Sequence, residues 1–181
     1  TTIHSGLKIP IKVFKPLPDK QRTVLRNRLQ YVQLFIIDEI SMVSSALLLN
    51  IHFRLCEIFG MKDQTIPFAG KGLIVCGDLY QLPPVSASPV FSLIGPGISA
   101  HKLWHLFKLC ELTESMRQRG DETFIDLLNN VRVGELEPEE EEMLKTRFIS
   151  RNDSNYPWHA LHLFAENAAA NTHNIFMLNS I

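Results

Sequence analysis

Cysteine is scarce in this chain of 181 residues, and long apolar runs are missing. The cysteines Cys56, Cys76 and Cys110 are widely spaced and form no CxxC pair, so the pattern supports neither a disulfide framework nor a zinc site. We expect reduced, mostly buried thiols. No window approaches about 18 uncharged apolar residues, and residues 1–10 lack the charged-then-apolar order of a signal peptide. These absences argue against membrane insertion and secretion, and the expected setting is intracellular.

A phosphate-binding loop of the form GxxxxGK[ST] is also missing. Gly70-Lys71 is followed by Gly72, and Thr65 stands where the first glycine is required. Without the lysine and backbone amides of such a loop, a nucleoside triphosphate loses most of its binding partners.

The chain opens at Thr1 without a strand or cap ahead of it and stops within an apolar element. We therefore expect a fragment of a longer protein.

The charge of the chain is unevenly distributed. The net charge is −1, but residues 1–32 carry seven basic residues against Asp19, a balance of 7 − 1 = +6, and the remainder carries 11 − 18 = −7. Such a cluster can attract phosphate backbones, although a run of lysines and arginines is more often a solvated surface. The acidic run of residues 135–143 is expected to begin an exposed helix and to repel nucleic acid. The basic residues are Lys8, Lys12, Lys15, Lys20, Arg22, Arg26 and Arg28.

Apolar blocks alternate with helical patterns, which favours an α/β fold with a largely parallel sheet. Ser44 or Ser45 is a candidate cap for a helix that extends to Phe59, with Gly60 as its stop signal. We predict further helices at residues 19–32, 122–133 and 139–148. Strands are predicted at residues 33–37, 72–77 and 107–113. Residues 160–176 are predicted to form a strand that passes into a helix. Leu103, Trp104 and Phe107 are expected in the core, whereas Tyr80 and Phe91 are candidates for stacking on bases.

Polar side chains follow two of the predicted strands. Asp38 and Glu39 come directly after the first, and residues 78–81 come after the second. In an open parallel sheet such groups meet at the edge formed by the C-terminal strand ends. One carboxylate there can hold Mg²⁺ while its neighbour deprotonates an attacking water. The alternative is that the acids only mark the return of the chain to solvent.

Two further segments favour a functional role for these acids over a simple return of the chain to solvent. Gln81 is placed to approach a terminal phosphate, and the segment 112–121 supplies Arg117 and Arg119. Arginine is the preferred group for stabilising charge on a transferring phosphoryl group. Together the three segments predict nucleotide hydrolysis.

These segments resemble the Pif-type (petite integration frequency) DNA helicases, superfamily-one motors that include the Helitron transposon helicases and are related to RecD. The resemblance spans nearly the whole chain in the family's order. The matching stretches are TTIHSGL at 1–7, IIDEISMV at 36–43, GDLYQLPPV at 77–85 and LTESMRQRGD at 112–121, with a looser match, FAENAAANTHN, at 164–174.

The resemblance implies a role for each matching residue. Asp38 is similar to the family's magnesium-site acid, Glu39 to the carboxylate that activates water, and Gln81 to its γ-phosphate sensor. Arg117 is similar to the arginine that reaches the γ-phosphate from across the cleft, where it acts as an electrostatic group.

The resemblance also implies a DNA contact in the first segment. Thr2, His4 and Ser5 fall in the stretch that lies along single-stranded DNA in relatives. For His4, the alternative outside this context is an ordinary surface histidine.

The fold that the resemblance implies is a partial RecA-like P-loop NTPase domain, mainly parallel, in residues 1–150. Residues 151–181 then begin a second RecA-like domain, with the polar patch at residues 150–157 as the junction. In the family the phosphate loop lies upstream of the segment that matches residues 1–7. The isolated chain is therefore expected to be nearly inactive.

The implied function is that of a central piece of an ATP-dependent 5′-to-3′ DNA helicase that uses ATP and Mg²⁺. The implied partners are single-stranded and forked DNA, with no membrane, no other small molecule and no required oligomer. Expected roles are DNA repair, recombination and telomere or transposon maintenance, in the nucleus or, as an alternative, the mitochondrion. Two other interpretations stay open: an inactive single-stranded-DNA-binding remnant of a transposon helicase, and a different P-loop ATPase.

Overall fold

The computed structural model describes residues 1–92, 100–117 and 120–180. The chain divides into two compact units, Thr1–Glu135 and Leu136–Ile181, and each is described by itself. Residues 93–99 of the predicted long loop and Arg119 lie outside the described residues. None of the helices within the described ranges is long and apolar enough to cross a membrane.

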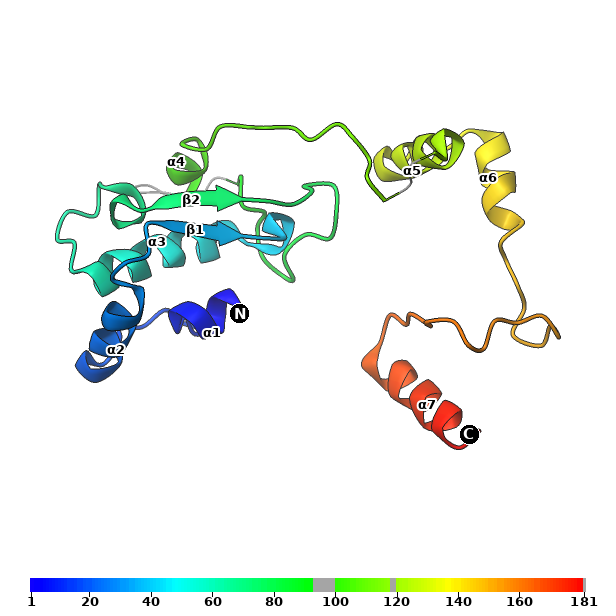
Figure 1. Ribbon diagram of the computed structural model, residues 1–181, viewed down its shortest axis with the longest axis horizontal. Coiled ribbons are helices and arrows are strands. Elements are labelled where there is room, and N and C mark those ends of the chain that lie inside the picture. The colour runs from blue at the N-terminus through cyan, green and yellow to red at the C-terminus, as the bar shows by residue number, and fades with distance from the viewer. Residues whose placement is uncertain (93–99, 118–119, 181) are drawn as a thin grey trace. The chain divides into compact units, whose positions relative to one another are not determined.

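The first unit is built on a parallel pair of strands (Figure 1). Strand β1 (Leu34–Ile37) pairs with β2 (Gly72–Val75) so that Leu34 lies opposite Gly72 and Ile37 opposite Val75. A parallel pair needs a long crossover between its strands. Helix α3 (Ser45–Phe59) supplies most of that crossover, as the alternation of apolar and helical patterns predicts.

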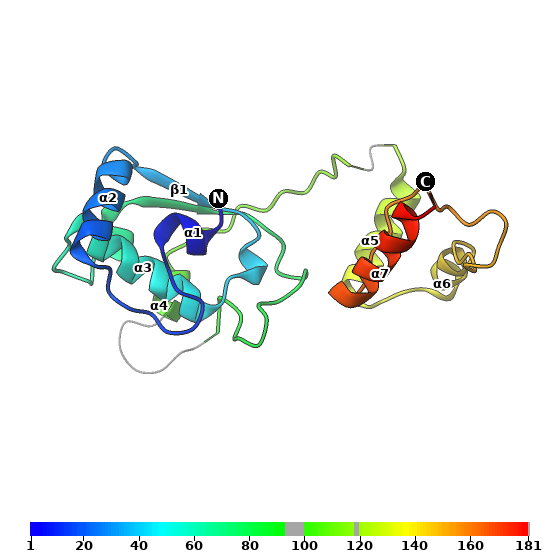
Figure 2. The same ribbon diagram turned by 90° about the horizontal axis from the view of Figure 1, so that it is seen from below.

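Helix α3 begins and ends at the signals predicted from sequence. The Ser44 side chain accepts a hydrogen bond from Leu47 N at 3.0 Å, and Gly60 caps the C-terminus with a φ of 70°. Both are standard terminal devices. Helix α3 packs against α1 (Ile3–Leu7), α2 (Asp19–Leu29), α4 (Ala100–Trp104) and the 3₁₀ turn η2 (Pro67–Gly70). Figure 1 shows α1, α2 and α3 on the same side of the strands, and Figure 2 shows α1 next to α3.

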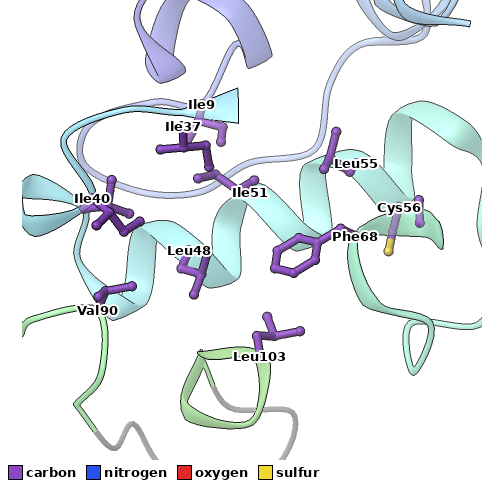
Figure 3. Packing of buried hydrophobic residues seen from close by; sticks show 12 residues of the cluster. Ile9, Ile37, Ile40, Leu48, Ile51, Leu55, Cys56, Phe68, Val90 and Leu103 are labelled. Atoms are coloured by element: carbon purple, nitrogen blue, oxygen red, sulfur yellow. The ribbon is translucent and has the colours of Figure 1, made fainter. Parts of the chain in front are cut away.

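The core of the first unit lies between α3 and the strands. Leu48, Ile51, Leu55 and Ile58 form an apolar stripe on α3 and are all buried. Figure 3 shows Ile51 of α3 beside Ile37 of β1. Burying one such side chain contributes about 1.5–3 kcal/mol, so this stripe is a main source of stability. Leu103 is also buried, and Trp104 and Phe107 pack against the same cluster, which confirms the expected core role of all three residues.

A buried histidine joins α3 to the loop ahead of β2. His52 Nδ1 accepts a hydrogen bond from Phe68 N at 3.0 Å, and Nε2 lies 3.0 Å from Gln64 O. The ring is therefore neutral, with its proton on Nε2. Burial lowers the pKa of His52 below its usual 6.5, and the hydrogen bond to Gln64 only partly opposes this effect.

This histidine should make stability depend on pH. Because its pKa is lower in the folded chain, the unfolded state binds more protons below pH 6.5. The free energy of unfolding should thus be maximal above pH 6.5 and fall by up to about 1.4 kcal/mol per pH unit as acid is added. Denaturant titrations at several pH values measure this slope. In the control variant, His52→Gln, the slope should be smaller, and an unchanged slope would contradict the assignment.

Helices α5, α6 and α7 also follow the sequence patterns, although α6 ends at Lys145 and not at residue 148. Helix α5 (Glu122–Val133) has the predicted bounds, with Asp121 accepting from Phe124 N at 3.1 Å and Gly134 as its C-cap. In the second unit, α6 (Pro138–Lys145) starts with three glutamates in its first turn. Helix α7 (Asn167–Leu178) follows the looser family match.

Two predicted strands are wrong for the described residues. Residues 107–113 and 160–164 form no ladder, and Leu109 and Leu161 are 93% and 89% exposed. An apolar stretch becomes a strand only where a neighbouring strand accepts its hydrogen bonds. Within the described residues β1 and β2 form the only sheet, so these stretches have no partner.

Burial also differs from expectation in two places. Parallel strands are normally covered on both faces, yet Ile36 is 67% exposed and Leu34 and Ile74 are exposed beside it. All three cysteines are free, as predicted, but only Cys56 is buried. The exposure of Leu34, Ile36 and Ile74 has one cause: none of the described elements covers the second face of the sheet.

Candidate functional site

The C-terminal ends of β1 and β2 form one edge. Backbone pairing continues past the strands, because Cys76 N donates to Ile37 O at 2.8 Å and Ile40 N donates to Cys76 O at 2.9 Å. These bonds hold Asp38 and Glu39 beside the start of the second loop. The structure therefore brings the two polar segments together as the strand order predicts.

Gly77 is required for this close approach. A Cβ atom added at Gly77 would lie 2.8 Å from Ile40 N and 3.3 Å from Glu39 Cα, and its φ of +144° is one that L side chains rarely adopt. Only glycine lets the second loop pass this near to the acids.

The two acids at the edge are exposed, so neither incurs the cost of burial. Asp38 Oδ1 accepts a hydrogen bond from Glu39 N at 2.9 Å. Glu39 has φ +54° and ψ +51°, in the left-handed region that few non-glycine residues occupy. The 3₁₀ turn η1 (Ile40–Met42) begins directly after it. Such strained backbone is frequent at functional sites.

The donor set at this edge is compatible with Mg²⁺. Asp38 has a second carboxylate oxygen beyond the one that accepts from Glu39 N. Within the described ranges no group of three or more His, Cys, Asp or Glu residues is placed to hold a metal by itself. Mg²⁺ needs no such cage, because it keeps several waters and binds one or two carboxylates together with substrate phosphates.

The loop after β2 is folded into a tight turn. Asp78 Oδ1 accepts from Tyr80 N at 3.0 Å, and Asp78 O accepts from Gln81 N at 3.0 Å. Gln81 is exposed at the end of this turn. Gln81 is thus held by its own loop, whose first residue Gly77 lies close to Glu39 and Ile40.

An arginine that sequence reasoning missed contacts this loop. Arg132 Nη2 of α5 lies 2.7 Å from Asp78 Oδ1, and the Arg132 guanidinium lies 4.8 Å from the centre of the Tyr80 ring. The segments are 54 residues apart. No sequence signal links them, because an arginine on the last turn of a helix is normally explained by the helix dipole.

Arg117 is not brought to the edge by any contact among the described residues. It is exposed, in a segment without regular structure. Its expected approach to the γ-phosphate stays a prediction.

The residues predicted to contact DNA have local structural partners. Thr2 caps α1 by accepting from Ser5 N at 3.2 Å, and His4 Nδ1 lies 2.9 Å from Ile9 O. Thr2 and Ser5 are exposed and His4 is half-buried. Their DNA role therefore stays a prediction.

The basic stretch is only partly engaged by the fold. Arg22 pairs with Asp19, and Arg26 Nε donates to Ile58 O at 2.6 Å. The remaining basic residues of the stretch are exposed: Lys8, Lys12, Lys15, Lys20 and Arg28. This surface remains accessible to an anionic partner.

A pocket of about 510 Å³ lies in the second unit. Sequence reasoning missed it. Arg151 Nη2 lies 3.0 Å from His173 Nδ1. The pKa of His173 is lowered by burial and, to a smaller extent, by His162 and Arg151. The lining residues are Arg151, Trp158, Phe164, Ala169, Thr172, His173 and Phe176.

Comparison with known sequences agrees with the family resemblance of the sequence motifs. A model of the PIF1-like helicase family matches residues 1–142. The ATP-dependent DNA helicase PIF1 of Saccharomyces cerevisiae (strain YJM789) is 35% identical over 152 residues, which are 80% of this chain and 17% of that protein. Xenopus laevis PIF1 is 45% identical over 100 residues, 55% of this chain and 15% of that protein. The chain thus spans less than a fifth of these two curated relatives.

Solved structures show the same likeness. The crystal structure of Pif1 helicase from Candida albicans superposes with a TM-score of 0.76 and 28% identity, covering 99% of this chain and 40% of that one. The Pif1 helicase from Bacteroides in complex with ADP-AlF3 and ssDNA superposes with a TM-score of 0.68 and 26% identity, covering 97% and 42%. The matched region includes the edge of β1 and β2 and helix α5.

Proposed function

Because the chain belongs to the PIF1-like helicase family, we propose that it is a segment of an ATP-dependent DNA helicase. In the intact enzyme, ATP hydrolysis drives 5′-to-3′ movement along single-stranded DNA and unwinding of the duplex ahead. Two RecA-like domains close on ATP and open after hydrolysis, with residues 1–150 in the first domain and residues 151–181 beginning the second. The observation that carries this proposal is the family match over residues 1–142, which includes the edge of β1 and β2.

The exposed apolar face of the sheet supports the proposal of a longer protein. Parallel strands are normally covered on both faces, whereas Leu34, Ile36 and Ile74 are exposed here. We assign the missing cover and the phosphate loop to segments of the intact enzyme outside these residues.

Each edge residue has a chemical role in this proposal. Glu39 takes a proton from the attacking water onto a carboxylate oxygen, and the Gln81 amide hydrogen-bonds the γ-phosphate. Asp38 would hold Mg²⁺, and Arg117 stabilises charge on the transferred phosphoryl group once the second domain closes. When bound, Mg²⁺ supplies further charge neutralisation on the phosphates.

Thr2, His4 and Ser5, with the exposed lysines that follow, form the proposed surface for single-stranded and forked DNA. The Bacteroides Pif1 complex with ssDNA supports this class of partner. The proposed cellular roles are DNA repair, recombination and maintenance of telomeres or transposons, in the nucleus or alternatively the mitochondrion. The proposal requires no oligomer.

Tailed duplexes test the activity and its direction. The intact helicase that contains this segment should unwind a forked or 5′-tailed duplex when ATP and Mg²⁺ are present, and should leave a 3′-tailed duplex intact. A strand-displacement assay measures both. Preferential unwinding of the 3′-tailed duplex would contradict the proposed direction.

The isolated 181-residue chain serves as the comparison in the same experiment. Its ATP hydrolysis should be near background, because the phosphate loop is absent, and robust Glu39-dependent hydrolysis would contradict the fragment interpretation. Its affinity for single-stranded DNA should fall steeply with salt, and less steeply after substitution of Lys8, Lys12 and Lys15 by Gln. An intact product that binds DNA without hydrolysing ATP would instead support the inactive remnant.

A further inference from the structure

In the contact between α5 and the Gln81 loop, two donors meet at one carboxylate. Asp78 Oδ1 accepts both from Tyr80 N at 3.0 Å and from Arg132 Nη2 at 2.7 Å. The same guanidinium lies over the Tyr80 ring at 4.8 Å. Arg132 therefore holds both the side chain that shapes the turn and the aromatic ring within it.

This contact is poorly suited to a purely stabilising role. The Arg132 and Asp78 side chains are 45% and 25% exposed, and ion pairs this accessible to water contribute little to stability. A guanidinium that donates to a carboxylate and also lies over an aromatic ring nevertheless constrains geometry strongly. The expected consequence of the contact is thus the position of the loop.

The contact with Arg132 also determines which acids at the edge carry a charge that no cation among the described residues balances. Asp78 is the third carboxylate at this edge, beside Asp38 and Glu39. With its charge balanced by Arg132, it adds little repulsion toward a bound triphosphate. Without Arg132, an uncompensated negative charge would stand two residues before Tyr80 and three before Gln81.

Resting on the function proposed above, we propose that Arg132 is a positioning residue for the Gln81 loop. It holds the turn in place through Asp78 and Tyr80 and connects the γ-phosphate sensor to helix α5. Helix α5 follows the segment that carries Arg117 in the sequence. Arg132 acts through Asp78 and Tyr80 and does not itself contact the substrate.

The first experiment uses the 181-residue chain and needs no nucleotide. Arg132→Gln should accelerate hydrogen exchange at the amides of Tyr80 and Gln81, leave the amides of β1 unchanged and leave the melting temperature nearly unaltered. Arg147→Gln, which removes an exposed arginine at the end of α6, is the matched control. Equal exchange at Tyr80 and Gln81 in wild type and Arg132→Gln would overturn the proposal.

The second experiment uses the intact helicase. Arg132→Gln should lower kcat for DNA-stimulated ATP hydrolysis by about 10- to 100-fold, the loss typical of a displaced reacting group. Arg132→Lys should recover part of that loss, and Arg147→Gln should leave kcat unchanged. Asp78→Asn combined with Arg132→Gln should be no worse than the more severe single variant, because both act on one contact. Full activity of Arg132→Gln, or additive losses, would overturn the proposal.

The two experiments separate this inference from the proposed function. If the intact protein shows no DNA-stimulated hydrolysis and Glu39 is without effect, the helicase proposal fails, and the coupling to catalysis fails with it. The exchange measurement still decides whether Arg132 positions the loop. If hydrolysis requires Glu39 but not Arg132, only the inference about Arg132 fails.

Discussion

Replacing Glu39 by Gln in the intact helicase is expected to lower kcat for ATP hydrolysis by about 10²- to 10⁴-fold, the usual contribution of a positioned general base. Glutamine has the same shape but takes up no proton from water. Because Glu39 is exposed and its backbone N–H rather than its side chain makes the contact with Asp38, the fold should not change. Steady-state hydrolysis with saturating single-stranded DNA gives the measurement.

The comparison for this variant separates chemistry from binding. Glu139→Gln, at an exposed acid in the first turn of α6, should leave kcat unchanged. Glu39→Gln should bind single-stranded DNA as tightly as wild type, so that only the chemical step is affected. If Glu39→Gln hydrolyses ATP at the wild-type rate, Glu39 is not the base and the proposed roles at this edge must be reassigned.

Replacing Arg54 by Ala is expected to destabilise the first unit by about 3–5 kcal/mol, the cost of breaking a buried ion pair by removing one partner. Arg54 is fully buried on α3. Its Nη1 donates to Glu57 Oε2 at 2.5 Å, and its Nη2 donates to Lys15 O at 2.8 Å and lies 3.3 Å from Lys8 O. Without Arg54, Glu57 and both carbonyls lose a donor inside the protein.

The loss of stability in Arg54→Ala should be concentrated in residues 8–17. Glu57 Oε1 also accepts from Leu17 N at 2.5 Å, and the Arg54 guanidinium lies 4.6 Å from the centre of the Phe14 ring. Arg54 and Glu57 together hold this segment against α3. Its amides should therefore exchange much faster in Arg54→Ala, and the candidate DNA surface should lose its fixed position.

Denaturant titration of the 181-residue chain measures this change, with two variants for comparison. Arg54→Lys keeps the charge but reaches fewer of the three acceptors, so it should recover only part of the stability. Arg22→Ala removes an exposed pair with Asp19 and should cost less than about 1 kcal/mol. A loss in Arg54→Ala no larger than that in Arg22→Ala would show that the buried network contributes little.

Local signals predicted the elements that need no distant partner. The serine cap and glycine stop of α3 and the bounds of α5 follow from residues within one turn of each helix end. The strands β1 and β2 were also predicted, together with the edge that carries Asp38, Glu39 and the turn to Gln81. The order of strands in a parallel sheet is enough to place these groups together.

The predicted strands at residues 107–113 and 160–164 were wrong because an apolar stretch does not reveal whether a neighbouring strand exists to pair with it. Arg54 and Arg132 were missed for a related reason. Each lies on a helix, where an arginine is usually explained by solvent or by the helix dipole. Their partners lie 39 to 54 residues away in sequence.

The sequence alone determined the family, the parallel crossover through α3 and the acids at the strand ends, because caps, apolar periodicity and strand direction are encoded within short stretches. The tertiary structure decided which charged side chains are buried or paired: Arg54 beneath residues 8–17, and Arg132 against Asp78. Electrostatic contacts depend on distance in space and on exclusion of water, and neither quantity exists until distant segments pack together.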